Sequence, residues 1–194
     1  MPYNLGLKTK TFAGEVNILD SQHARYIRGG ATIDRTKVSG GFDTLVDGLT
    51  RKILKVGTFL AKLASGKWCP AKVSELAQAA AAASNTLTLK NATAFQPGDA
   101  IDVGGTAAVI AADGVNYATN VVTLTAAIGI DKAVDTPVRA TDGGVAACVL
   151  TEEVDVTDGD QVTTGIDHGR VVTARLPVAP VQAVKDALKE ITFS

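Results

Sequence analysis

The side chains best suited to catalysis or metal binding in this sequence are two histidines and two cysteines. His23 and His168 lie far apart, and neither has a histidine or cysteine three or four residues away, as metal sites on a single element do. Cys69 and Cys148 are too few for a disulfide framework, and we expect both to be small buried hydrophobic residues. The sequence therefore predicts no bound metal and no cofactor.

Catalysis by a serine or cysteine nucleophile requires a histidine base and a carboxylate that orients it. No Gly-x-Ser-x-Gly motif is present, and His168 lies between Asp167 and Gly169, a pattern typical of a solvated turn. The sequence contains neither the Gly-x-x-x-x-Gly-Lys-Ser/Thr motif nor a strand-to-helix Gly-x-Gly-x-x-Gly motif, the two glycine-rich motifs that bind phosphates. We therefore expect the protein not to be an enzyme. The alternative, a hydrolase, would depend on His168.

Acidic side chains gather between Glu152 and Asp160. Asp155, Asp158 and Asp160 could supply oxygen ligands, but the run lacks the glutamate that closes a calcium loop. The favoured interpretation is a charged strand edge that discourages unwanted pairing.

The composition narrows the class of protein further. The chain has 194 residues and a formal net charge of -1, which argues against non-specific nucleic-acid binding. Charge is nevertheless uneven, because residues 1–72 hold 12 of the 19 Lys+Arg and 5 of the 20 Asp+Glu. No apolar run approaches the roughly 20 residues that a membrane span requires, and the first residues do not resemble a secretory signal. We expect synthesis in a cytoplasm and no contact with a membrane.

The elements that carry these residues are predicted to be mostly β-strands. Residues 1–50 contain short apolar segments interrupted by glycine pairs. This pattern predicts an extended arm that is at least partly disordered until it binds a partner. Residues 51–63, which end at Ser65-Gly66-Lys67, predict a strand, a turn and a second strand, and Gly57 within them predicts a bulge or a sharp bend. Trp68, the one tryptophan, is interpreted as a core or subunit-contact anchor.

The rest of the chain divides into an all-β stretch and a mixed C-terminal part. A short helix is expected over residues 74–83. Strands are expected over residues 85–89, 100–103, 106–111, 120–125, 145–150 and 170–176. Residues 180–193 predict an amphipathic helix with Val181, Val184, Leu188 and Ile191 on its apolar face.

Four short sequence segments, taken in their order along the chain, resemble a known family. They are Gly57-Thr58-Phe59-Leu60-Ala61-Lys62, Ser65-Gly66-Lys67-Trp68-Cys69-Pro70, Ala146 to Leu150 leading into Thr151-Glu152-Glu153-Val154-Asp155-Val156, and His168-Gly169-Arg170-Val171. Together they resemble the core of the bacteriophage lambda-type head decoration proteins, over roughly residues 51–72 and 142–194. Residues 82–141 interrupt that core where the family has a short loop, and the phrase from Thr86 to Asp99 resembles small β-domains of phage virion proteins.

The resemblance implies a mainly β fold with a small β-barrel, tulip-like decoration core closed by a C-terminal α-helix. The core would comprise residues 51–81 and 142–194, with an inserted all-β domain at 82–141 and the extended N-terminal arm at 1–50. The arm would bind the capsid, as family members do by adding a strand to a capsid loop. Its candidate contacts are Lys8, Lys10, Phe12, Arg25, Tyr26 and Arg28.

The function implied is that of a capsid decoration, or cement, protein. It would bind the major capsid protein on the outer surface of the expanded phage head, at local threefold positions and as a homotrimer, and would stabilise the shell. Its location would be the outer surface of the virion after synthesis in the host cytoplasm. The alternative is a tail- or fibre-associated adhesin module whose residues 85–141 bind a cell-surface glycan.

Overall fold

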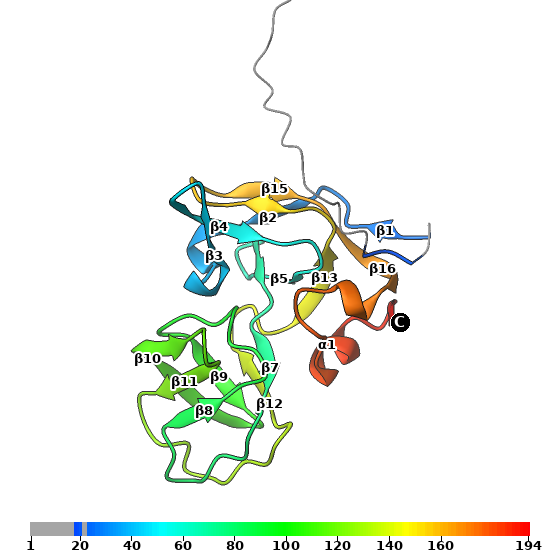
Figure 1. Ribbon diagram of the computed structural model, residues 1–194. Helices are drawn as coiled ribbons and strands as arrows, with labels where there is room; N and C mark the ends of the chain where they lie inside the picture. Colours follow the sequence, from blue (N-terminus) through cyan, green and yellow to red (C-terminus); the bar gives the residue numbers. More distant parts are fainter. Residues whose placement is uncertain (1–17, 21–22) are drawn as a thin grey trace, which may run out of the picture.

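The computed structural model describes residues 18–20 and 23–194 and is mainly β, as the sequence predicts (Figure 1). In this part of the chain, strands form three sheets, and α1 (Gln182–Ala187) is the one α-helix. The arm residues Lys8, Lys10 and Phe12 lie outside the described residues.

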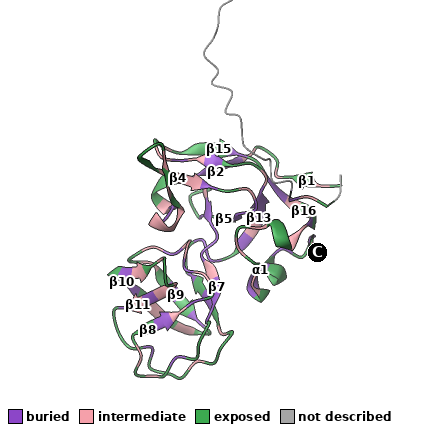
Figure 2. Ribbon diagram, in the orientation of Figure 1, coloured by how far each residue is buried: buried purple, intermediate pink, exposed green. Residues whose placement is uncertain are grey.

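The largest sheet has eight strands and curls into a half-barrel. Its order is β1 (Arg25–Tyr26), β16 (Gly165–Val171), β13 (Ala146–Leu150), β5 (Phe59–Lys62), β6 (Trp68–Pro70), β2 (Ala31–Ile33) and β15 (Gln161–Thr163), while β17 (Ile191–Phe193) pairs with β16. Successive side chains of a strand point to opposite faces, so Phe59 and Leu60 enter two different hydrophobic clusters. Figure 2 shows buried residues along β5 and β13.

Residues 23–50 are part of the folded structure, because β1 and β2 lie in the eight-stranded sheet and residues 43–46 pair in a second sheet. The prediction of an extended arm is wrong for these residues. Ala31 and Ile33 of β2 are fully buried, because β2 lies between β6 and β15. A three-residue strand preceded by the glycine pair Gly29-Gly30 gives little periodic signal in the sequence. Its stability comes from partners more than thirty residues away, which local pattern does not reveal.

A small three-stranded sheet follows β2 in the chain. Its order is β14 (Val154–Asp155), β4 (Leu49–Leu54) and β3 (Asp43–Val46). The turn between β3 and β4 places Asp47 and Gly48 at φ of 51° and 77°, the left-handed pair typical of two-residue hairpin turns. The 3₁₀ turns η1 (Arg35–Lys37) and η2 (Gly40–Phe42) connect this sheet to β2.

The third sheet has six strands, all from one continuous stretch of chain. Its order is β7 (Val73–Glu75), β12 (Pro137–Ala140), β9 (Ala100–Val103), β10 (Thr106–Asn116), β11 (Val121–Leu124) and β8 (Thr86–Thr88). The strands predicted near residues 86, 100, 106 and 120 are all present. The chain enters through β7 and leaves through β12, and these two strands pair with each other. A separate cluster, which includes Leu87, Phe95, Ile110 and Val122, fills the interior.

The helix predicted over residues 74–83 is absent, and the sheet begins at residue 73 rather than 82. Ser74 and Leu76 are fully buried, and the amide of Ala77 donates to the carbonyl of Thr88. Helix propensity of the alanines is outweighed here because the backbone hydrogen bonds go to neighbouring strands.

The C-terminal part also departs from prediction in three places. The strand predicted over residues 170–176 ends at Val171, and Thr173–Arg175 form the 3₁₀ turn η3. The helix is shorter than expected, since it ends near Leu188 and the chain continues as β17, parallel to β16. Val184, Leu188 and Ile191 are nevertheless buried, as their spacing predicted. His168 lies inside β16 rather than in a turn, because β1 pairs with β16 at that residue.

Candidate functional site

The described residues among the predicted capsid contacts lie on or next to an edge strand. Strand β1 ends the eight-stranded sheet, so one side of its backbone has no neighbouring strand in the described chain. Tyr26 is 52% exposed and Arg28 is also exposed. Arg25 forms an ion pair with Asp167, with 2.7 Å between Nε and Oδ1, and this hydrogen bond and charge raise the pKa of Arg25. Arg25 is thus already partnered within the chain.

The segment before β1 is attached to the same side of the body. Ile18 is 2% exposed and belongs to the cluster that also contains Phe59. Leu19 bridges Val171 at the end of β16, and Asp20 pairs with Arg170 at 2.9 Å. The basic N-terminal residues therefore precede a firmly attached point beside β16.

Trp68 packs against the cluster that contains Ile33 and Leu60, and it is partly buried. Its backbone pairs with Ile33 and with Lys62. These contacts agree with a core anchor, while a contact with another subunit stays a prediction.

Both cysteines are fully buried and unpaired, which confirms the prediction of buried small residues. Burial raises the pKa of Cys69 and of Cys148 to about 12. Because the thiolate is the nucleophile and metal ligand, both side chains are chemically inert near neutral pH.

His168 lies in β16 beside Glu190. The His168 Nδ1 lies 3.2 Å from Glu190 Oε2, and both side chains are largely exposed. Within residues 18–20 and 23–194, no three His, Cys, Asp or Glu side chains gather closely enough to hold a metal ion. Across the same residues, no helix combines the length and apolar character needed to cross a membrane.

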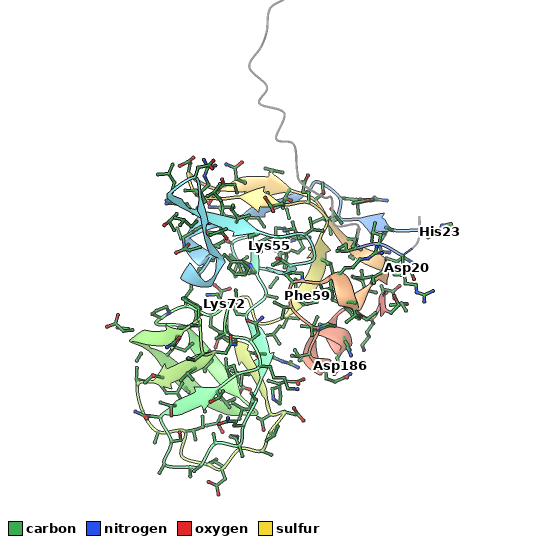
Figure 3. The ribbon with its side chains drawn as sticks, viewed as in Figure 1. Asp20, His23, Lys55, Phe59, Lys72 and Asp186 are labelled. Carbon is green, nitrogen blue, oxygen red and sulfur yellow. The ribbon has the colours of Figure 1, made fainter. Side chains whose placement is uncertain are left out.

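A buried ion pair that the sequence pattern did not predict lies where the chain passes from the eight-stranded to the six-stranded sheet. Lys72 is 1% exposed, and its Nζ lies 2.7 Å from Asp99 Oδ1 and 3.0 Å from Gln96 Oε1. Figure 3 shows Lys72 in the region between the sheets. A lysine inside the apolar run from Trp68 to Val73 is the signal that could have identified it, because buried charges require a partner.

Further contacts hold the six-stranded sheet against the rest of the chain. The Ser39 hydroxyl donates to the carbonyl of Thr93, and the Gln96 side-chain amide donates to the carbonyl of Thr36 at 3.1 Å. At Gly41 an added Cβ would lie 2.4 Å from the carbonyl oxygen of Thr93, so only glycine fits this approach. Glu75 accepts a hydrogen bond from the amide of Gln182, at the start of α1.

A cleft of about 350 Å³ opens at this junction. Its lining is mostly apolar and comes from all three sheets and the loop before α1; it includes Phe42, Ile53, Phe59, Pro70, Val73, Ala94 and Pro177. The charged residues in the lining are Asp43 and Lys55. Asp43 is paired with Lys52 at 2.8 Å, whereas the exposed Lys55 forms no ion pair with the described residues. The cleft therefore carries one uncompensated positive charge.

Compared with known proteins, the chain matches no family model, no curated protein sequence and no solved structure.

Proposed function

We propose that the protein is a phage capsid decoration protein. It binds the major capsid protein on the outer surface of the expanded head, at local threefold positions and as a homotrimer, and it stabilises the shell. The observation that supports this proposal best is the attachment of the N-terminal segment. Leu19 pairs with Val171 of β16, the strand that also pairs with β1, and the basic residues Lys8 and Lys10 precede this attached segment in the sequence.

The proposed contact is addition of a strand. An extended peptide that pairs with a sheet edge or loop gains affinity from main-chain hydrogen bonds and needs no preformed pocket. Lys8 and Lys10 add positive charge to this segment, which favours association with an acidic shell surface. Residues 23–50 are part of the folded sheets, so the contact is proposed for the residues before Ile18.

Stabilisation of the head follows from linkage. A protein that binds the intact expanded shell but not its separated subunits shifts the equilibrium towards the intact shell. One arm binds modestly because ordering it costs conformational entropy. Several arms on one rigid assembly raise the effective concentration of each and so strengthen attachment.

The six-stranded sheet is proposed to project away from the shell as an inserted domain. Its two aromatic side chains are Phe95, which is 1% exposed, and Tyr117, whose hydroxyl donates to the carbonyl of Phe95 at 3.1 Å. Sugar-binding surfaces commonly need an exposed aromatic face. The Phe95 ring is buried in the interior, and the Tyr117 ring lies against Gly40 and Gly41 at the junction. The glycan-binding alternative therefore stays a prediction, to be tested on a glycan array.

The test mixes the purified protein with expanded heads that lack decoration and images them by electron microscopy. We expect ordered density at local threefold positions and heads that withstand higher temperature. Lys8→Glu with Lys10→Glu should weaken binding, while Lys185→Glu with Lys189→Glu, on the exposed side of the C-terminal segment, serves as the charge-matched control. Bare heads with the wild-type protein would refute the proposed function.

A further inference from the structure

The hairpin of β3 and β4 ends in an exposed apolar tip. Leu45 is 74% exposed and Leu49 is 61% exposed. Leu45 lies opposite Thr50 and Leu49 lies opposite Val46, so the two leucine side chains point to opposite faces of the ribbon. Both remain in contact with water, which costs free energy unless another surface covers them.

The tip stands clear of the other strands. Strand β14 pairs with β4 only at Ile53 and Leu54, near the base of the hairpin. Within the described part of the chain, the backbone of residues 45–50 therefore pairs only with itself. The turn is well defined because Asp47 and Gly48 adopt the left-handed conformations that a two-residue hairpin requires. An apolar surface on a defined hairpin is a suitable docking element.

The charge of the tip is negative and uncompensated. Asp47 is the one charged residue between residues 45 and 50, and it forms no ion pair with the described residues. The next charged residues along the ribbon are already paired: Asp43 with Lys52, and Arg51 with Asp155. The tip thus combines two leucines with one free carboxylate.

The junction cleft has the complementary character. Its walls are mostly apolar, and Lys55 supplies its one uncompensated charge. Figure 3 shows Lys55 and Phe59 near the region between the two large sheets. The volume of about 350 Å³ lies at the lower end of the range of roughly 300–1,000 Å³ for small-molecule pockets, which suits a few side chains.

A molecule does not fill this cleft with its own tip. Thr44 and Ile53, at the base of the hairpin, are part of the cleft wall, whereas residues 45–50 are not in the lining. The ribbon therefore extends away from the cleft that its base helps to build. The same two surfaces on a second copy are free to meet in a head-to-tail contact, which closes into a ring or continues as a chain according to the rotation between copies.

We propose that the hairpin tip of one copy binds the junction cleft of a second copy. Leu45 or Leu49 enters among the apolar walls, and the Asp47 carboxylate approaches the Lys55 ammonium. The contact deepens the proposed function, on which it rests for its biological role, because it names the surfaces that join copies of a decoration protein. It requires neither a cofactor nor a covalent step.

Sedimentation velocity of the full chain, up to millimolar concentration, tests the contact. The wild type should associate reversibly. Leu45→Ser with Leu49→Ser damages the tip, and Lys55→Glu reverses the cleft charge; each should weaken association by about tenfold or more, as expected for residues central to an interface. Val162→Ser removes another exposed apolar side chain, and Lys62→Glu reverses another exposed lysine. These two controls should associate like the wild type.

Mixing the variants tests the head-to-tail arrangement directly. The tip variant retains an intact cleft, and the cleft variant retains an intact tip. Each alone should associate about tenfold or more weakly than the wild type, but a mixture should form pairs with the wild-type affinity and nothing larger. Circular dichroism of each variant confirms that it is folded. A monomeric wild type, variants that associate like the wild type, or a mixture that stays monomeric would each overturn the proposal.

Binding of the same proteins to undecorated heads separates this proposal from the proposed function. If the wild type binds heads but the tip and cleft are not required for self-association, only the tip-to-cleft contact is wrong. If the wild type associates as expected but does not bind heads, the contact stands and the decoration function is wrong.

Discussion

The two large sheets differ in how far apart in the sequence their strands lie. All strands of the six-stranded sheet come from residues 73–140, and β9, β10 and β11 are antiparallel neighbours in chain order. The eight-stranded sheet collects strands between residues 25 and 193, and it includes two parallel pairs, β2 with β6 and β16 with β17. The comparison teaches that one region is specified by local hairpins and the other by contacts between distant segments.

The largest expected effect comes from breaking the ion pair between these regions. Lys72→Met leaves Asp99 without its cation, and removal of one partner of a buried pair costs about 3–5 kcal/mol. Urea unfolding should show this loss, and the double variant Lys72→Met with Asp99→Asn should recover part of it. Lys62→Met, at an exposed lysine, is the control. A stability equal to wild type in the single variant would show that the pair does not hold the regions together.

A second pair of substitutions compares the two interiors. Ile33 in β2 is fully buried and Ile110 in β10 is 1% exposed, and replacing either with alanine should lower the free energy of unfolding by about 2–5 kcal/mol. Hydrogen exchange should show that each substitution loosens its own sheet more than the other. An unchanged unfolding midpoint for Ile33→Ala would contradict the conclusion that residues 23–50 are part of the folded core.

The third prediction concerns a smaller tie between the six-stranded sheet and α1. The helix has no side-chain cap of its own at Val181, and the buried Glu75 accepts from the first helical amide, at Gln182, over 2.9 Å. Glu75→Ala should cost about 1–2 kcal/mol, as loss of a helix cap does. Glu75→Gln keeps an accepting oxygen and should cost less. Equal losses in the two variants would contradict the capping role.

The smallest expected effect is a pH dependence in the three-stranded sheet, where β14 pairs with β4 from a distant part of the chain. Burial alone would raise the pKa of Asp155, but hydrogen bonds from Thr157 and the interaction with Arg51 outweigh it and lower that pKa. A lowered pKa in the folded state stabilises the fold above the ordinary aspartate value of about 3.9, and this contribution is lost as the pH falls through the folded-state pKa.

Asp155→Asn should therefore be less stable than wild type near neutral pH, and the difference should shrink as the solution is acidified. Denaturation midpoints measured across the acidic range test this expectation. Asp158→Asn, at an exposed carboxylate next to the same turn, is the control and should follow the wild type. A difference from wild type that grows on acidification would contradict the sign of the shift.

The sequence predicts the six-stranded sheet well, because alternation and turn residues lie close together there. The strand at residues 100–103 has the predicted bounds. The same reasoning failed at β2, where three residues receive their partners from residues 68 and 161–163. The prediction of a helix at residues 74–83 also failed. The backbone of this alanine-rich segment hydrogen-bonds with Thr88 and with Lys132, and Lys132 lies about fifty residues away.

The candidate site was less accessible to prediction than the fold. The buried pair of Lys72 and Asp99 and the cleft beside Lys55 both require three-dimensional contacts between segments that the sequence keeps apart. Their residues carry ordinary surface chemistry, so charge alone does not distinguish them from solvated lysines. The exposed leucines of the β3–β4 hairpin are likewise typical strand residues until the structure leaves them uncovered.

The pairing of β7 with β12 has a practical consequence for protein engineering. Because the first and last strands of the six-stranded sheet are direct neighbours, the chain returns to the half-barrel about 5 Å from where it left, the spacing of paired strands. A foreign sequence with closely spaced ends should therefore be accommodated between Ala71 and Thr141. The half-barrel thus offers a graft point for displaying cargo.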